Sequence, residues 1–291
     1  MKAKGRLTLA SIILLASALG ALPGRAAEAP ASPDPAGIRA ALAHGGWLAD
    51  PFATSTQAAA FGGLRVTPRL DAGEPSLRFA FGSPDDAGRP RAATVTIVRW
   101  LTGTLEIRST DERGREGVVR KSVRDSCARQ VEMRRVGTGE AAAWRVASVS
   151  ALVLATPRGR AGLPLVDLDT RVVSGGFLST LSDLDELNVY PQTCAVTTPG
   201  DSVRVFVGGI DSDASVCVVA GGRRIAARQR DGSHFEAMVA LDGPAGVQQI
   251  AVTVFPRRTL DDPNAPADSR TWVLPILVGA RPAAGEAYFP L

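Results

Sequence analysis

Residues 93–107 read ATVTIVRWLTGTLEI, and they are the clearest guide to the secondary structure of this sequence. Apolar residues alternate with threonines, which is the period of a strand that buries one of its faces. The residues that share the apolar face are Val95, Ile97, Leu101, Leu105 and Ile107. Arg99 interrupts this face once, and Gly103 stands where so long a strand would need to bend. The stretch therefore predicts a long, curved strand that is buried on one side.

The next apolar segment, residues 118–136, fits two interpretations. Its apolar residues recur every four positions, at Val119, Val123, Cys127 and Val131, and this spacing suits a helix as readily as one face of a strand. We favour the strand. Three charged residues would then share the inner face with these apolar ones, namely Lys121, Asp125 and Arg129. A buried carboxylate needs a cationic or hydrogen-bonding partner. Such charges would therefore either stabilise the sheet by pairing with one another or line a polar pocket.

Short alternating segments recur at regular intervals in the C-terminal third of the chain. They are residues 189–196, 202–207, 215–220, 224–228, 235–241, 247–255 and 271–278. Turn signals such as Pro199-Gly200-Asp201 and Asp242-Gly243-Pro244 separate them. Seven short strands with this spacing are typical of a β-sandwich.

The N-terminus has the pattern of a secretory signal peptide. Lys2, Lys4 and Arg6 precede an apolar run over residues 7–22, and small residues precede a cleavage site that we place after Ala26. Removing residues 1–26 takes away four of the 33 basic residues and none of the 29 acidic ones, so the formal charge falls from +4 to zero. A chain without a cationic surplus argues against a nucleic-acid partner. No second apolar run is long enough for a membrane span, and no Cys follows the leader to carry a lipid. We expect an exported protein, periplasmic or secreted.

Composition divides the remainder into segments. Residues 27–35 form a proline-rich tether, residues 36–157 a first domain, residues 158–186 a connection, residues 187–279 the sandwich, and residues 280–291 a tail rich in Ala, Pro and Gly. Within the first domain, Asp34 and Pro35 predict the start of a short helix with Ile38 and Leu42 on its apolar face. We expect a second helix over residues 50–61.

Two family resemblances give this division a fold class. The stretches PGDSVRVFV (199–207), SVCVVAGG (215–222) and GVQQIAVTVF (246–255) resemble strands of bacterial immunoglobulin-like domains of exported proteins, although the Cys…Trp…Cys core of antibody domains is missing. The order of helices, TVTIVRWLTGTLEI, VVRKSVRDSCARQVEM and AAWRVASVSAL resembles the nuclear transport factor 2-like (cystatin-like) group. The resemblances imply an α+β N-terminal domain with a curved antiparallel sheet, followed by an all-β Ig-like sandwich. A small β-barrel is the alternative for the first domain.

The sequence offers few groups for catalysis. After the leader, it contains two histidines, His44 and His234, and a single lysine, Lys121. The zinc motif HExxH, the redox and metal motif CxxC, and the nucleophile motifs GxSxG and SxxK do not occur. The acidic stretches at 211–213 and 261–268 do not match a calcium loop. We therefore predict no catalytic residue, no metal site and no cofactor, and we lean towards a protein that is not an enzyme.

Binding candidates come from the predicted inner face and its surroundings. In pocket-bearing members of the group that the first domain resembles, such inner residues contact a ligand. Five residues are candidates for a ligand pocket here: Asp125, Arg129, Arg99, Trp100 and Trp144. Cys194 and Cys217 are candidates for a disulfide in an oxidising compartment, although Cys127 could instead pair with either of them.

Three hypotheses for function follow. The first is an exported, non-catalytic binding or interaction protein with a protein or cell-surface partner. The second is a small-ligand binder or pocket enzyme that uses the N-terminal domain. The third is a structural spacer in a cell-envelope assembly.

Overall fold

Strands dominate the computed structural model. It describes residues 34–49, 58–137, 142–155, 167–172, 176–181, 196–197 and 199–279. Strand makes up 62% of the structure and helix 8%. The helices are α1 (Pro35–His44) and α2 (Arg257–Asp261). The strands up to residue 155 are β1 (Ala59–Phe61), β2 (Leu64–Ala72), β3 (Ser76–Phe81), β4 (Ala92–Thr110), β5 (Glu116–Val136), β6 (Ala143–Val149) and β7 (Leu152–Ala155). Those that follow are β8 (Asp167–Val172), β9 (Gly176–Leu181), β10 (Val196–Thr197), β11 (Ser202–Gly208), β12 (Ser215–Ala220), β13 (Arg223–Ala226), β14 (Arg228–Asp231), β15 (His234–Ala240), β16 (Gly246–Phe255) and β17 (Arg270–Val278).

Residues 93–107 lie in strand β4, and the segment 118–136, for which helix and strand were both open, lies in strand β5. The two pair antiparallel along their whole length, from Ala92 opposite Arg134 to Thr110 opposite Glu116. The turn that joins them is fixed by Asp111, whose Oδ1 accepts hydrogen bonds from the backbone N–H groups of Arg113 and Arg115. Buried residues alternate along both strands as the pattern predicts, so the preference for a strand at residues 118–136 is confirmed.

Helix α1 begins where the capping residues predict. The side chain of Asp34 accepts a hydrogen bond from the backbone N–H of Gly37 at 2.8 Å, and Pro35 occupies the first turn. Ile38 and Leu42 are completely buried and pack with Trp47 against the inner face of the β4–β5–β6 part of the sheet. The second expected helix, over 50–61, is wrong at its end: residues 59–61 form strand β1, and residues 50–57 lie outside the described part of the chain.

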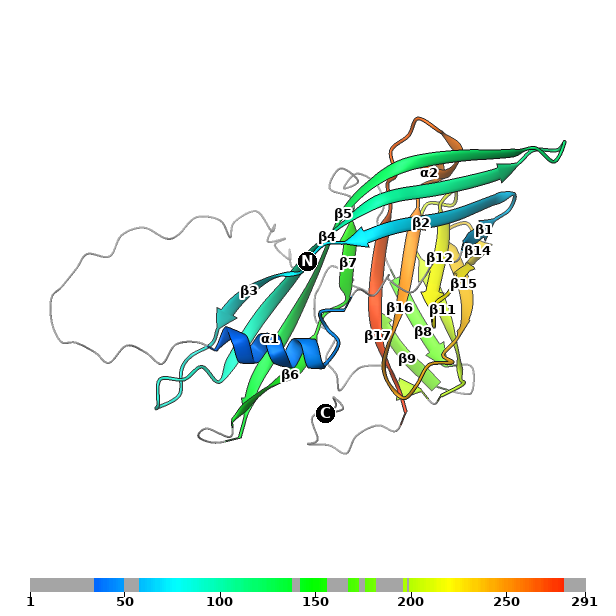
Figure 1. Ribbon diagram of the computed structural model, residues 1–291. Coiled ribbons are helices and arrows are strands. Elements are labelled where there is room, and N and C mark those ends of the chain that lie inside the picture. Colours follow the sequence, from blue (N-terminus) through cyan, green and yellow to red (C-terminus); the bar gives the residue numbers. More distant parts are fainter. Residues whose placement is uncertain are drawn as a thin grey trace, which may run out of the picture.

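A single sheet of twelve strands connects the two halves of the chain. Its main path runs β1-β2-β4-β5-β7-β17-β16-β12-β13, with β3 and β6 flanking the β4–β5 hairpin and β10 on β17. The short strand β7 makes the connection, because it pairs with β5 on one side and with β17 on the other. The end strands β1 and β13 contact each other, so the sheet is nearly closed into a barrel-like shape. In Figure 1 the green β4–β5 hairpin passes across the upper ends of β12, β16 and β17.

The expected fold class is therefore wrong. An α+β domain followed by an Ig-like sandwich would have two separate sheet systems, whereas here the strands of both halves belong to one curled, nearly closed sheet. The physical reason is that alternation specifies which face of a strand is buried but not which strand lies beside it. Residues 1–33 and 280–291 lie outside the described residues, so the predicted signal peptide, the tail and most of the tether stay predictions.

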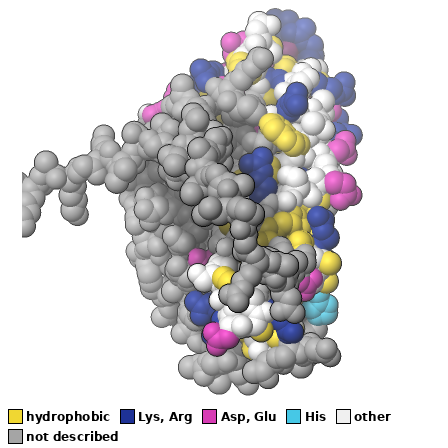
Figure 2. All heavy atoms as spheres, turned by 90° about the vertical axis from the view of Figure 1, so that its left-hand side faces the viewer, with side chains coloured by type: hydrophobic (Ala, Val, Ile, Leu, Met, Phe, Trp, Pro, Cys, Tyr) yellow, Lys and Arg dark blue, Asp and Glu magenta, His cyan; other side chains and the backbone are white. Residues whose placement is uncertain are grey.

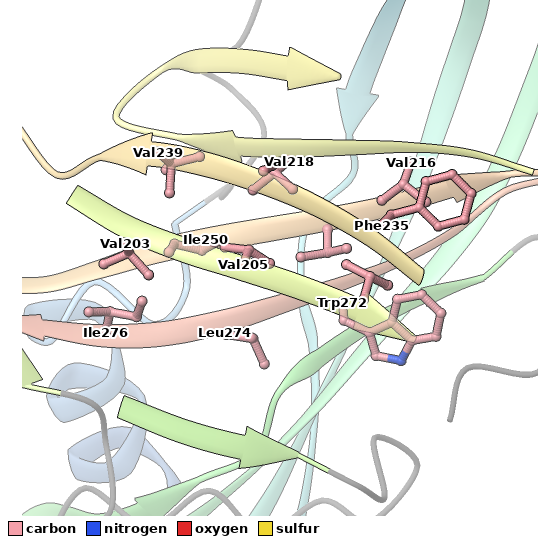
Figure 3. Close-up of a cluster of buried hydrophobic side chains, with 14 of the residues drawn as sticks. Val203, Val205, Val216, Val218, Phe235, Val239, Ile250, Trp272, Leu274 and Ile276 are labelled. Carbon is pink, nitrogen blue, oxygen red and sulfur yellow. The ribbon is translucent and has the colours of Figure 1, made fainter. Parts of the chain in front are cut away.

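A second sheet covers the C-terminal part of the first one. Its strand order is β14-β15-β11-β8-β9. Figure 3 shows valines of β11 and β15 meeting Val216, Ile250 and Trp272 of the large sheet in one buried cluster. This cluster takes every second residue of β12, β16 and β17, and the alternate residues face the interior of the curled sheet. Strands buried on both faces explain nearly continuous apolar runs such as residues 250–255.

Candidate ligand-binding cavity

A cavity of about 410 Å³ lies inside the curled sheet. Strands β2, β4 and β5 supply one side, and strands β7, β12, β13, β16 and β17 supply the other. The apolar lining residues are Pro68, Leu70, Leu105, Val123, Leu154, Val219, Ala251, Phe255 and Ala267. Five consecutive residues of β2, Thr67 to Asp71, contribute, so the backbone of this strand forms part of the wall.

A glycine of β4 lies beside the part of the cavity wall that β2 forms. Gly103 of β4 has φ +155°, a region that residues with a Cβ rarely adopt. It lies opposite Leu70 of β2, and a Cβ built on it would lie 2.0 Å from the carbonyl oxygen of Arg69. The glycine predicted as a bend thus lets the backbones of β2 and β4 approach closely beside the cavity.

Asp125 is the one predicted pocket residue that lines this cavity. It lies on β5 opposite Leu101 of β4, and only 1% of its surface is exposed. The strand assignment explains its position, because Val123 and Cys127 share the buried face with it. The sequence therefore predicted correctly that a carboxyl group points to the inner face of the sheet.

Arg224 brings a cation to the same cavity from β13. It lies opposite Val219 of β12, which also lines the cavity, so the two side chains share one face of the sheet. Burial lowers the pKa of Arg224, and the nearby Cys217 opposes this effect in part. Sequence reasoning missed Arg224 because its segment was assigned to a separate sandwich. A basic residue inside the short apolar-flanked strand 223–226 was the available signal.

Hydroxyl groups and two charged residues of β2, Arg69 and Asp71, complete the polar part of the lining. Thr253 on β16 and Thr271 on β17 lie directly opposite each other, and their Oγ1 atoms share a buried hydrogen bond of 2.8 Å. Ser269, just before β17, also lines the cavity. A mostly apolar wall with a few polar groups is the usual character of a small-molecule site.

Cys217 lies beside the cavity as a buried thiol. Burial raises its pKa to about 11, although Arg224 works against this shift, so the thiol is protonated at neutral pH. A protonated, buried thiol is a poor nucleophile. Cys217 is a free cysteine, and Cys194 lies outside the described residues, so the disulfide between them stays a prediction.

The loop that contains α2 covers one end of the cavity, where Ala267 and Ser269 are lining residues. Lys121 of β5 forms hydrogen bonds with the backbone of this loop. Its Nζ donates hydrogen bonds to the carbonyl oxygens of Asp262, at 2.5 Å, and Ala265, at 2.8 Å. Burial lowers the pKa of Lys121, while the acidic residues of the loop act in the opposite direction. Lys121, the only lysine after the predicted leader, therefore lies on the inner face of β5 and fixes the α2 loop by these two hydrogen bonds.

Arg99 and Arg129 lie at the other end of the inner face, beneath α1. Arg99 donates a hydrogen bond from Nη2 to the carbonyl oxygen of Leu48, just after the helix. The guanidinium of Arg129 lies over the ring of Trp47 at 5.2 Å from its centroid. Both contacts anchor the segment that follows α1, and neither arginine lines the cavity.

The two predicted tryptophans are also outside the cavity lining. Trp144, on β6, is 6% exposed and belongs to the cluster under α1. Trp100 points to the outer face of β4 and is 47% exposed. The guanidinium of Arg124 lies over its ring, 5.3 Å from the centroid. Basic residues continue across this outer face, where Arg108 and Arg120 bind Glu106 between them. Figure 2 shows Lys and Arg side chains gathered toward the top of the molecule with acidic ones among them.

The described residues show neither a metal site nor a membrane-spanning helix. These contain no group of three or more His, Cys, Asp and Glu side chains that could hold a metal ion. In the part of the chain that the structure describes, no helix has the length and apolar character to cross a membrane. His234 lies on the surface, where its Nδ1 contacts Oδ1 of Asp231 at 2.5 Å. The buried carboxylate of Asp268 forms an ion pair with Arg258.

The comparisons with known proteins add no relative to this geometry. The two family resemblances named from the sequence therefore stay untested as relationships, while the fold that they implied is wrong. The sequence matches no protein-family model and no curated protein, and no solved structure matches the chain.

Proposed function

We propose that this protein binds a small organic molecule in the cavity inside the curled sheet. The observation that carries the proposal is a cavity of about 410 Å³ whose lining combines apolar residues with polar and charged ones, among them the buried carboxyl group of Asp125 and the guanidinium of Arg224. Ligand pockets typically measure ~300–1,000 Å³ and combine an apolar lining with a few polar groups that orient the ligand. Closed sheets of about eight strands hold one small ligand in other proteins, and the main path of the nearly closed sheet here has nine strands.

The chemistry of the lining supports binding more than turnover. A nucleophile or general base would need a side chain with a pKa near the working pH. The described lining contains neither His nor Lys, and the adjacent Cys217 has its pKa raised to about 11 by burial. The interaction and spacer hypotheses stay predictions, as does export of the protein.

The proposal can be tested by filling the cavity. Ala251 lines it from β16 and is 5% exposed, so Ala251→Phe would occupy part of the space. Ala128→Phe is the matched control, because Ala128 lies on the opposite, outer face of β5 and is absent from the lining. Overpacking a filled core costs about 1–3 kcal/mol, but an existing cavity can absorb the added ring.

The full chain is purified from its own host and measured by native mass spectrometry before and after mild denaturation. We expect a small non-covalent mass on the wild-type protein and on Ala128→Phe, and its loss from Ala251→Phe. Wild-type protein that carries no small molecule, and captures none from a small-molecule extract of its host, would overturn the proposal. So would a ligand that Ala251→Phe retains in full.

A further inference from the structure

The cavity borders an edge of strand β2 rather than one of its faces. Five consecutive residues, Thr67 to Asp71, line it, although successive side chains of a strand point to opposite faces. Strand β4 pairs with β2 along the whole length of β2, whereas β1 pairs with it only from Leu64 to Val66. Among the described strands, none therefore pairs with residues 67–72 on the side away from β4.

Strand β1 shows that an extended segment fits beside this edge. It pairs with β2 and also contacts β13, so it lies in the seam where the curled sheet nearly closes. Because β1 has three residues and β2 has nine, β1 occupies only the first part of this seam. The cavity borders β2 where β1 has ended, and Arg224 of β13 lines it as well. A further extended segment, placed in line with β1, would lie along the open edge of β2.

The backbone of β2 presents hydrogen-bonding groups to this position. A Cβ built on Gly103 of β4 would lie 2.0 Å from the carbonyl oxygen of Arg69, so this carbonyl points toward β4. Because backbone groups alternate in direction along a strand, the N–H and C=O of Leu70 and the C=O of Pro68 point away from β4. Pro68 itself has no N–H, and proline is tolerated in a strand whose nitrogen faces an open edge. Open strand edges bind extended peptides by strand addition.

The side chains of β2 give this edge a preference among peptides. Pro68 and Leu70 lie opposite residues of the inner face of β4, so their side chains share that face. Arg69 and Asp71 alternate with them and are exposed. Opposite charges directly across from each other on neighbouring strands are favourable, and like charges are unfavourable. A segment that pairs with β2 would therefore carry an acidic residue opposite Arg69, a basic residue opposite Asp71, and apolar residues between and beside them.

We propose that the open edge of β2 binds an extended segment of a partner protein by strand addition. The added strand is antiparallel to β2, as both β1 and β4 are. From its N-terminus it reads basic, apolar, acidic, apolar and polar, opposite Asp71 to Thr67 in turn. This inference goes beyond the function proposed above, because it needs the backbone edge of β2 and no small molecule. Since the two apolar side chains enter the cavity, the peptide and a small molecule would compete for the same space.

Five-residue peptides test the charge preference on the full chain by fluorescence polarisation. The probe has the sequence KVEVT with blocked ends and a fluorescent label, and the control EVKVT has the same composition with its two charges exchanged. The exchange places like charges opposite both Asp71 and Arg69, so we expect EVKVT to bind about fivefold more weakly. The double variant Arg69→Asp, Asp71→Arg changes only exposed side chains and should reverse this preference.

A second pair of variants tests the backbone contact. Leu70→Pro removes the N–H that would donate to the peptide, and it spares the ladder with β4 because this N–H points away from β4. We expect KVEVT to bind at least about tenfold more weakly to Leu70→Pro. Leu70→Val is the matched control, since it keeps the N–H and an apolar side chain, and it should bind KVEVT as the wild type does.

Hydrogen exchange measured by NMR on the wild-type protein gives a readout that needs no variant. The peptide should slow exchange at the amide of Leu70, which points to the open edge. It should leave the amide of Arg69 unchanged, because that amide already faces β4. This measurement and the charge exchange decide the proposal even if Leu70→Pro does not fold.

The outcomes separate this inference from the proposed function. Equal binding of KVEVT and EVKVT, an unchanged preference in the double variant, or an unprotected Leu70 amide would overturn the inference. So would the absence of binding at about 1 mM peptide. A dimer of the free protein that dissociates in Leu70→Pro would assign the edge to a second copy of the chain and likewise overturn it. None of these results alters the mass-spectrometric test, which alone decides whether the cavity holds a small molecule.

Discussion

Replacing Gly103 by alanine tests how the wall between β4 and β2 is built. At φ +155° the residue occupies a conformation that costs an L-residue about 1–3 kcal/mol. The added methyl would also lie 2.0 Å from the carbonyl oxygen of Arg69 and 3.0 Å from the Cα of Leu70. Both neighbours are backbone atoms of β2, so no side-chain rotation can relieve the clash. Strand β2 would have to move away from β4 and weaken adjacent ladder hydrogen bonds, each worth about 0.5–1.5 kcal/mol.

The two effects together predict a loss of about 3–5 kcal/mol in the free energy of unfolding. Gly114→Ala is the control, because Gly114 lies in the β4–β5 turn with φ +75° and nothing lies within 4 Å of an added Cβ. That variant should lose only the cost of placing a residue with a Cβ at a positive φ, about 1–2 kcal/mol. Urea unfolding of the full chain, followed by tryptophan fluorescence, measures both. Equal losses for the two variants would refute the close approach of β2 to β4. A smaller loss for Gly103→Ala would refute it as well.

Three further substitutions test other contacts. Lys121→Met removes both hydrogen bonds to the α2 loop, so unfolding should become easier by about 2 kcal/mol and amide exchange in residues 256–269 should accelerate in hydrogen-exchange mass spectrometry. Glu106→Gln should make the free energy of unfolding, measured with urea at different pH values, depend less on pH in the acid range. Arg108 and Arg120 lower the pKa of Glu106, so its contribution is complete above the ordinary value of 4.5 and is lost as pH falls through the lower folded pKa. Arg129→Met should cost about 1–2 kcal/mol through the lost contact with Trp47, and leave ligand affinity unchanged.

Much of the local structure could be predicted from the sequence. The alternation in residues 93–107 predicted which side chains of β4 are buried, and Val95, Ile97 and Leu101 are 5% exposed or less. The same reasoning placed Asp125 and Arg129 on the inner face of β5, where both are buried. These predictions succeed because the period of side chains along a strand depends only on local geometry.

The arrangement of strands could not be predicted in the same way. Residues 152–155 alternate correctly, but nothing in their sequence indicates that β7 pairs with both β5 and β17. The N-terminal candidates Arg99, Arg129 and Trp144 therefore seemed to share one pocket with Asp125, although the first two anchor the segment after α1. Register pairs of distant strands depend on tertiary packing, which a single sequence does not record.

The strands that are buried on both faces connect the fold to the proposed function. The side chains of β12, β16 and β17 that face the second sheet form a continuous core of large residues, including Val216, Ile250 and Trp272. Their opposite faces carry Ala251, Thr253 and Thr271 at the cavity, beside the larger apolar residues Val219 and Phe255. Because the second sheet already buries one face completely, these strands do not need large apolar residues on the other face to remain ordered. The inner face can therefore keep space and hydrogen-bonding groups for a ligand without losing the core that holds the sheet in its curled form.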